Sequence, residues 1–241
     1  MYRKIYSADE VHTLYSSQLF DTRFFCNCSI LRWLCREFCG IVNAMTHVVI
    51  GLGNPGEAYV HTRHNTGARM VQAFHDAEDF SPWKRGGKGT ALVSAGEVGT
   101  KKATLVLPQT FMNASGKAAG SFIKSAKAAS GLIVVYDDLD LPLGTLKISF
   151  GRSSGGHKGV ESVMKALKTK DFVRLRVGIS PVDAKGNVCK PRGEKHVLDF
   201  ILKPISAGEK TSYAAIEKRA CVALRRIIEY GWIKAASLGT L

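Results

Sequence analysis

Polar side chains of the kinds that hydrolyse esters stand where apolar, strand-like segments of the sequence end. His64 lies in a polar stretch after the apolar segment 46–51, and Asp137 follows the apolar run 132–136. A neutral imidazole can take a proton from water near neutral pH as a general base. A carboxylate on its other nitrogen fixes the tautomer and stabilises the imidazolium that forms. The two residue types together predict a site in which water attacks the substrate.

Two asparagines stand at comparable positions. Asn54 follows the first apolar segment, and Asn113 follows a later one. Carboxamides can hold a peptide backbone and donate hydrogen bonds to a developing oxyanion. Structural alternatives stay open for all four residues: Asn54 could cap its own turn, Asn113 could cap a helix over 114–128, His64 could be a structural histidine and Asp137 a solvated acid.

Other hydrolytic machineries find no support in the sequence. It contains no Gly-x-Ser-x-Gly elbow and no cysteine in a recognisable nucleophile setting. Four of the six cysteines fall in the first 44 residues, with gaps of one, six and three residues that do not match the C-x2-C spacing of structural zinc sites. No cluster of His, Cys and Asp has the spacing of a metal site, so we expect neither a metal nor a cofactor.

The segment 51–56 fits the G-x-G-x-x-G pattern of dinucleotide-binding turns. Pro55 stands where a helix should open its phosphate-facing amides, and the residues that follow lack helical periodicity. No second strand ending in an acid follows; Asp76 and Glu78 end a helical pattern instead. We interpret the glycines as a tight turn that carries Asn54, and keep a dinucleotide-dependent oxidoreductase as the weaker alternative.

The elements that must position these residues alternate along the chain. Apolar runs predict strands at 46–51, 91–95, 103–107, 132–137, 144–150 and 174–180. Helical patterns lie near 66–78, 113–128 and 156–168, and a last helix runs from a capping box at Ser206 and Glu209 to a C-cap at Gly231. This alternation predicts a single α/β domain, in which helices flank both faces of a mixed, largely parallel central sheet. The polar residues would then meet at one sheet edge.

Two segments modify this scheme. Residues 84–109 are typical of two strands joined by a turn at 96–99, which makes the sheet mixed. Residues 183–196 are rich in Lys, Arg, Gly and Pro and predict a basic loop.

Composition favours one domain with a polyanionic partner. The chain has 241 residues, of which 34 are Lys or Arg and 20 are Asp or Glu, so its formal net charge is +14. Such an excess favours nucleic acid or a substrate that contains it, although a solubilising surface is the alternative. No run of 18 uncharged apolar residues occurs, so no membrane span is expected.

The first 44 residues differ from the rest. They mix aromatics, cysteines and both charges without a clean period, and their five basic and four acidic residues give a net charge of only +1. We expect an N-terminal extension over 1–44 and a functional domain over 45–241, beginning at Met45. The extension could be a targeting segment, a lineage-specific appendage or an upstream stretch that was wrongly included in the gene model.

Six ordered blocks resemble the bacterial-type peptidyl-tRNA hydrolases. The first is VIGLGNPGEAYVHTRHNTG at 49–67, and the others lie at 108–117, 136–144, 155–159, 172–179 and 197–204. The resemblance extends from about residue 46 to residue 231. It implies an enzyme that hydrolyses the ester bond between a peptide, or an N-blocked amino acid, and the 3′ end of tRNA, and so recycles the tRNA.

The resemblance also implies roles for individual positions. His64 matches the catalytic histidine and Asp137 the aspartate that orients it, with no metal involved. Asn54 and Asn113 match residues that hold the substrate near the scissile ester.

Four further positions match the family's substrate contacts. Tyr59 and Met112 match positions that line the peptide cleft. Lys147 and Arg176 match basic positions that clamp the tRNA, with plain surface charge as the alternative.

One turn departs from the family pattern. The family's Gly-His-Asn-Gly is here Gly-His-Lys-Gly, with His157 and Lys158 at its centre, and Arg152 stands where glycine is frequent. We expect His157 and Lys158 to contact substrate; Lys158 could bind a phosphate or slow hydrolysis. A second hypothesis is therefore an RNA-binding relative with weakened catalysis, as in a plant organelle splicing factor that resembles this family. We expect a cytoplasmic monomer, or a mitochondrial protein if residues 1–44 are a targeting segment.

Overall fold

The computed structural model describes residues 46–239, and within them a seven-stranded sheet has the order β2-β3-β4-β1-β5-β7-β6. The strands are β1 (His47–Gly51), β2 (Lys84–Gly86), β3 (Ala91–Val98), β4 (Lys101–Pro108), β5 (Leu132–Pro142), β6 (Leu146–Phe150) and β7 (Val173–Ser180). The four central strands β4, β1, β5 and β7 are parallel, whereas β2, β3 and β6 pair antiparallel at the two edges. The predicted mixed, largely parallel sheet is confirmed.

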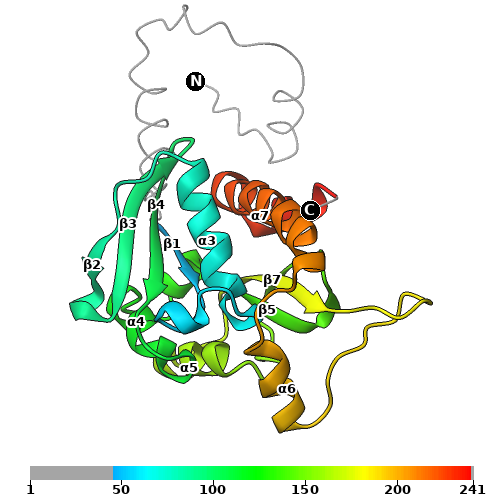
Figure 1. Cartoon of the computed structure of the whole chain (residues 1–241). Coiled ribbons are helices and arrows are strands. Elements are labelled where there is room, and N and C mark those ends of the chain that lie inside the picture. The colour runs from blue at the N-terminus through cyan, green and yellow to red at the C-terminus, as the bar shows by residue number, and fades with distance from the viewer. Residues whose placement is uncertain (1–45, 240–241) are drawn as a thin grey trace, which may run out of the picture. The chain divides into compact units, whose positions relative to one another are not determined.

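Helices cover both faces of the sheet. The helices are α3 (Thr66–Ala77), α4 (Ser115–Phe122), α5 (Lys158–Leu167), α6 (Glu194–Ile201), α7 (Lys210–Tyr230) and α8 (Trp232–Ser237). One core packs α3 and α7 against the sheet through Phe74, Leu175 and Leu224, and both helices lie over the same face in Figure 1. A second core packs α4 and α5 against the other face through Ile50, Val134 and Val160. Strands buried on both faces explain the continuous apolar runs of the sequence.

Several predicted boundaries moved. The helix predicted over 113–128 ends at Phe122, and β5 runs on through its acidic residues to Pro142 rather than ending at Asp137. The turn predicted at 96–99 lies two residues later, between Val98 and Lys101, because β3 runs on through Gly96 in its ladder with β4. The short strand β2 was not expected from its sequence. At the last helix the capping box of Ser206 and Glu209 is present, and Gly231 has a φ of 81° as its C-cap.

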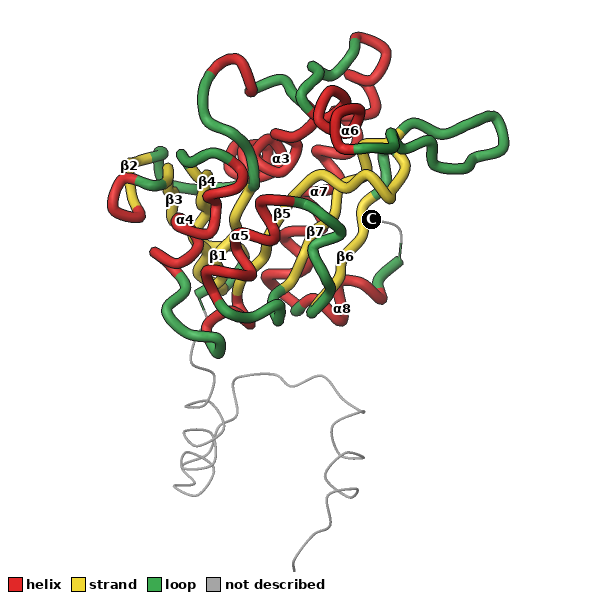
Figure 2. Tube along the Cα trace, turned by 90° about the horizontal axis from the view of Figure 1, so that it is seen from below, coloured by secondary structure: helices red, strands yellow, loops and turns green. Residues whose placement is uncertain are grey.

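The predicted basic loop is partly helical. Residues 181–193 reach out beyond the sheet in both views, between β7 and α6, and Figure 2 shows α6 beside the end of that loop. α6 begins at Glu194, inside the segment predicted as loop, because Val197, Leu198 and Ile201 give it one apolar face. The extension predicted over 1–44 lies outside the described residues. Between residues 46 and 239, no helix is both long enough and apolar enough to cross a membrane.

Candidate active site

The candidate base is carried by a tight turn between β1 and α3. His64 lies in the 3-10 turn η2 (Arg63–Asn65), directly before α3, and is 8% exposed. The glycine turn after β1 lets α3 approach the sheet closely: a Cβ on Gly51 would lie 2.7 Å from the carbonyl oxygen of Gly67. The helix does not open at Gly56, which confirms that the glycine pattern serves packing here and lacks the helix opening of a dinucleotide turn.

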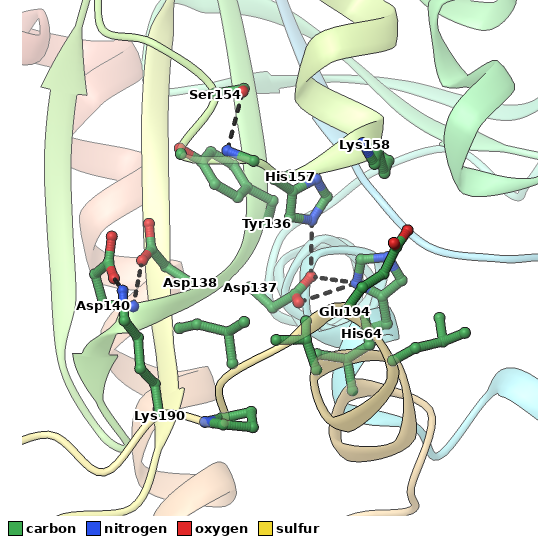
Figure 3. Close-up of a pocket in the computed structure, with 17 residues that line it drawn as sticks. His64, Tyr136, Asp137, Asp138, Asp140, Ser154, His157, Lys158, Lys190 and Glu194 are labelled. Atoms are coloured by element: carbon green, nitrogen blue, oxygen red, sulfur yellow. Dashed lines mark hydrogen bonds and ion pairs between the residues drawn. The ribbon is translucent and has the colours of Figure 1, made fainter.

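Asp137 lies against this turn from the end of β5. Its side chain is 3% exposed, and its two carboxylate oxygens lie 3.2 and 3.0 Å from Nδ1 of His64. Figure 3 shows the two side chains pointing toward one another. Because the carboxylate is the acceptor, Nδ1 carries the ring proton, and Nε2 keeps a free lone pair. The predicted pairing of His64 with Asp137 is thus present in the fold.

His157 adds a second imidazole to the same carboxylate. Its Nε2 lies 3.0 Å from Oδ1 of Asp137, and its Nδ1 accepts hydrogen bonds from the amides of Gly159 and Val160 at 3.2 and 3.3 Å, which caps α5. An imidazole nitrogen that accepts from two amides cannot also carry the proton, so Nε2–H donates to Asp137. His157, expected to contact substrate, instead has both ring nitrogens engaged within the protein.

The fold thereby creates a cluster that sequence spacing did not reveal. Potential ligand atoms of His64, Asp137 and His157 all lie within 4.8 Å of one another. Two imidazoles and a carboxylate are a ligand set that divalent metals accept. However, the cap on α5 keeps the proton on Nε2 of His157, and a protonated nitrogen offers no lone pair to a metal. The observed bonds fit a hydrogen-bonded triad better than a metal centre.

Burial and charge act in opposite directions on the triad. Burial alone would lower the pKa of His64, but the charge and hydrogen bonds of Asp137 outweigh it and raise that pKa above its ordinary value. Burial would raise the pKa of Asp137, but the two imidazoles together hold it below its ordinary range. The carboxylate therefore stays ionised near neutral pH, where it can stabilise a proton on His64.

A cavity of about 560 Å³ opens over His64, Asp137 and His157 (Figure 3). The β5 end and the turn 154–158 form one side, and α6 with the end of the basic loop forms the other. Lys158 lies at the rim and is 67% exposed, with Glu161 on its own helix 3.6 Å away. Lys158 therefore lines the opening and leaves the bonds among the three buried residues intact.

Asn54 ties two loops together rather than capping its own turn. Its Oδ1 accepts from the amide of Met112 at 2.8 Å. Asn65, next in the chain to His64, accepts from the amide of Asn54 at 2.8 Å and donates to its carbonyl at 2.9 Å. Asn54 and Met112 are thus linked to the base through Asn65, but neither lines the cavity, and the Met112 side chain, predicted to line a peptide cleft, is buried in the core. No specific role was predicted for Asn65, because its bonds to Asn54 are visible only in the fold.

Tyr59 and Asn113 lie next to Met112, on the same side of the candidate site. The Tyr59 ring packs edge-on against Phe111 with ring centroids 6.2 Å apart, and Phe111 is exposed. Asn113 is exposed and does not cap α4, whose first turn is preceded by Ala114 without a side-chain cap. Its amide is therefore free to meet a ligand, and an exposed aromatic shelf lies beside it.

The two predicted tRNA contacts lie on the other side of β5, on strands β6 and β7. Lys147 on β6 is paired in register with Arg176 on β7 and is exposed. Arg176 donates to Asp138 at 2.6 Å, and this carboxylate raises its pKa although burial opposes it. Asp138 itself lines the cavity, so Arg176 borders the site through an ion pair rather than with a free guanidinium.

Arg63 is a further residue that sequence reasoning missed. It donates to Glu209 at 2.6 Å and to the carbonyl of Pro204 at 3.0 Å, and its guanidinium lies 4.6 Å from the Phe200 ring centroid. These contacts fasten the turn of His64 to α6 and to the start of α7. The helix α6, which these contacts hold, could have been predicted from the helical spacing of the apolar residues within 197–201.

Comparison with known proteins finds relatives that cover most of the chain. A family model described as peptidyl-tRNA hydrolase matches residues 48–239. The peptidyl-tRNA hydrolase of Gemmatimonas aurantiaca is 37% identical over 192 residues, covering 79% of this chain and 97% of that protein. That of Aquifex aeolicus is 37% identical over 184 residues, covering 76% and 90%. A crystal structure of peptidyl-tRNA hydrolase from Acinetobacter baumannii matches with a TM-score of 0.70 at 25% identity, covering 80% of this chain and 94% of that one.

Proposed function

The chain belongs to the peptidyl-tRNA hydrolase family, and on that premise we propose that it hydrolyses the ester linking a peptide to the 3′ end of tRNA. The observation that carries the proposal is the buried His64–Asp137 pair beneath an open cavity. The reaction consumes one water and releases a peptide carboxylic acid and a tRNA with a free terminal hydroxyl.

His64 is the general base of the proposed reaction. A water in the cavity gives a proton to Nε2 while its oxygen attacks the ester carbonyl carbon, and Nδ1–H stays bonded to Asp137. The tetrahedral intermediate collapses when the bond to the ribose oxygen breaks, and the proton from His64 passes to that oxygen. Asp137 favours the first proton transfer, because its negative charge stabilises the imidazolium that forms.

Tyr59 and Asn113 are proposed to bind the peptide, whereas Asn54 and the buried Met112, predicted as substrate contacts, are proposed to support this side of the site from within. The exposed carboxamide of Asn113 and the aromatic shelf beside it can contact a peptide without reading its side chains. Asn54 acts differently: its carboxamide oxygen is engaged by Met112, so it holds this side of the site in shape. Recognition of backbone rather than side chains suits an enzyme that accepts many peptides.

Lys147, Arg176 and Lys158 are proposed to bind the tRNA. The first two lie side by side on β6 and β7, and Lys158 lies at the cavity rim at the start of α5, where the helix dipole adds to its charge. Substrate affinity should therefore fall steeply with salt, as expected when phosphates are neutralised. A Michaelis constant independent of salt would contradict this assignment.

An RNA-binding relative with weakened catalysis is the second candidate, because Lys158 replaces an asparagine. The intact bonds of His64 and Asp137 favour hydrolysis over this alternative. Release of N-acetyl-amino acid from N-blocked aminoacyl-tRNA separates the two: the wild type should turn over, and His64→Ala should lose activity. His61→Ala is the matched control, an exposed histidine in the same segment. A wild type no faster than His64→Ala would reject the proposed function.

We further propose a cytoplasmic monomer, following the bacterial-type relatives. A mitochondrial location remains the alternative if residues 1–44 are a targeting segment. Mass spectrometry of the native N-terminus and light scattering of the purified chain test the two points.

A further inference from the structure

Arg174 is a fully buried cation in the part of the chain described by the structure, and no carboxylate there pairs with it. It lies on β7 with an exposed fraction of 0%. Its Nη1 donates to the carbonyl of Ser153 at 2.8 Å, its Nη2 approaches the sulfur of Met164 at 3.6 Å, and Nε has no partner. The guanidinium lies 4.8 Å from the Phe172 ring centroid. Burying a charge beside neutral partners is unfavourable, so its retention calls for a reason.

The bonded carbonyl belongs to the turn that joins β6 to α5. Gly151, Gly155 and Gly156 in this turn have φ values of 64°, 62° and 85°, a backbone with few intrinsic restraints. The amide of His157 donates to the carbonyl of Ser154 at 3.2 Å, which closes the turn on itself. Arg174 fixes the turn to the sheet from below.

The turn ends at His157, which shares Asp137 with the base. Tyr136 packs beside His157: the two ring centroids lie 4.9 Å apart. Burial raises the pKa of Tyr136 to about 12, and the charge of Arg174 opposes that rise. Arg174 therefore supports the turn through its hydrogen bond to the carbonyl of Ser153.

We infer that Arg174 is a positioning residue for the proposed hydrolysis: by holding the turn at Ser153 it keeps His157 bonded to Asp137, and so sets how much charge Asp137 presents to His64. The inference rests on the proposed function. If His157 moved away, the whole carboxylate would face His64, and the imidazolium form would gain stability. The base would then be protonated over a wider pH range and would work more slowly near neutrality.

Other charged groups around His64 stay unchanged in the test. Those lining the same cavity are Asp138, Asp140, Lys158, Lys190 and Glu194. Tyr213 approaches from α7, where its hydroxyl lies 3.3 Å from that of Thr66.

The test compares Arg174→Met with Arg174→Lys, alone and in a His157→Asn background. For Arg174→Met we expect kcat to fall about tenfold with KM nearly unchanged, which is about 1.4 kcal/mol of transition-state stabilisation. The acid limb of the pH profile should move to higher pH, and Arg174→Lys should recover part of kcat. In the His157→Asn background the same substitution should cost less than about twofold, because the path through His157 is already cut.

A purely structural role would give a different pattern. Val163→Ala removes methyl groups from the same core without touching the bonds of Arg174, and should lower the melting temperature while leaving the pH profile in place. An equal tenfold loss in both backgrounds, or an unmoved acid limb, would overturn the inference. NMR titration of His64 gives a readout independent of turnover: its pKa should rise in Arg174→Met. An unchanged pKa rejects the positioning role, whereas absent turnover in the wild type rejects only the hydrolase.

Discussion

Asp137→Asn changes few atoms and should nonetheless disable the base. The carboxylate accepts from His64 Nδ1 at 3.0 and 3.2 Å and from His157 Nε2 at 3.0 Å. An asparagine offers one acceptor oxygen, and its amide group must face one of the two N–H donors. Losing one charge-assisted bond costs about 1.5–3 kcal/mol. If His64 turns to its other tautomer, the lone pair at Nε2 is lost as well, so we expect kcat to fall about 10⁴-fold, the size of such tautomer losses in hydrolytic triads.

The pH profile distinguishes this reasoning from simple unfolding. In the wild type the charge of Asp137 holds the pKa of His64 above its ordinary value, and activity is lost as pH falls through that pKa. Without the charge, burial prevails and lowers the pKa, so residual activity should persist to lower pH. Single-turnover release of N-acetyl-amino acid from N-blocked aminoacyl-tRNA measures both effects, with exposed Asp79→Asn as the matched control. A kcat within about threefold of wild type, or an acid limb that stays in place, would refute the argument.

Three further outcomes follow from named contacts. Gly67→Ala should destabilise the fold by about 3 kcal/mol and lower the melting temperature by about 10 °C, because the new Cβ would lie 2.8 Å from the carbonyl of Leu52; an unchanged calorimetric transition would contradict this. Lys158→Asn should raise KM and reduce the slope of log KM against log salt by about one, without lowering kcat; a slope equal to that of wild type would remove Lys158 from the tRNA contact. The pKa of Glu209 is lowered because Arg63 and Ser206 outweigh burial, so its stabilising effect is present above its ordinary value of 4.5 and is lost as pH falls through the folded pKa. Urea unfolding should therefore separate Glu209→Gln from wild type near neutral pH and bring the two together in acid.

The apolar pattern of the sequence was sufficient to predict the central strands, but it did not predict that β5 continues through its acidic residues. The strands β1, β4 and β7 are buried on both faces, so their sequences carry an unambiguous signal. β5 continues through Asp138 and Asp140 as far as Pro142, because its backbone pairs with β7 on both sides of an irregularity. Arg176 and Lys190 pair with the two carboxylates there, and such long-range pairing cannot be read from a linear pattern.

The pairing of His64 with Asp137 could be predicted, because parallel strand ends share one edge of a sheet. The bond from His157 to Asp137 could not, since it depends on the path of a turn that contains three glycines of positive φ. Arg174 was equally hidden: alternating arginines in a strand favour an exposed face, yet this one is covered by the turn. Asn113 was placed correctly as a polar residue after a strand, but only the fold shows that it is exposed and does not cap α4.

The fixed protons of the triad also constrain any small molecule that would occupy the cavity. Nδ1 of His64 and Nε2 of His157 already donate to Asp137, so a ligand meets a lone pair at Nε2 of His64. On the opposite wall it meets the apolar side chains of α6. A suitable inhibitor therefore brings one hydrogen-bond donor and a hydrophobic edge, and its affinity should decline in acid as His64 becomes protonated. The pH at which small molecules are screened therefore affects which of them bind in this cavity.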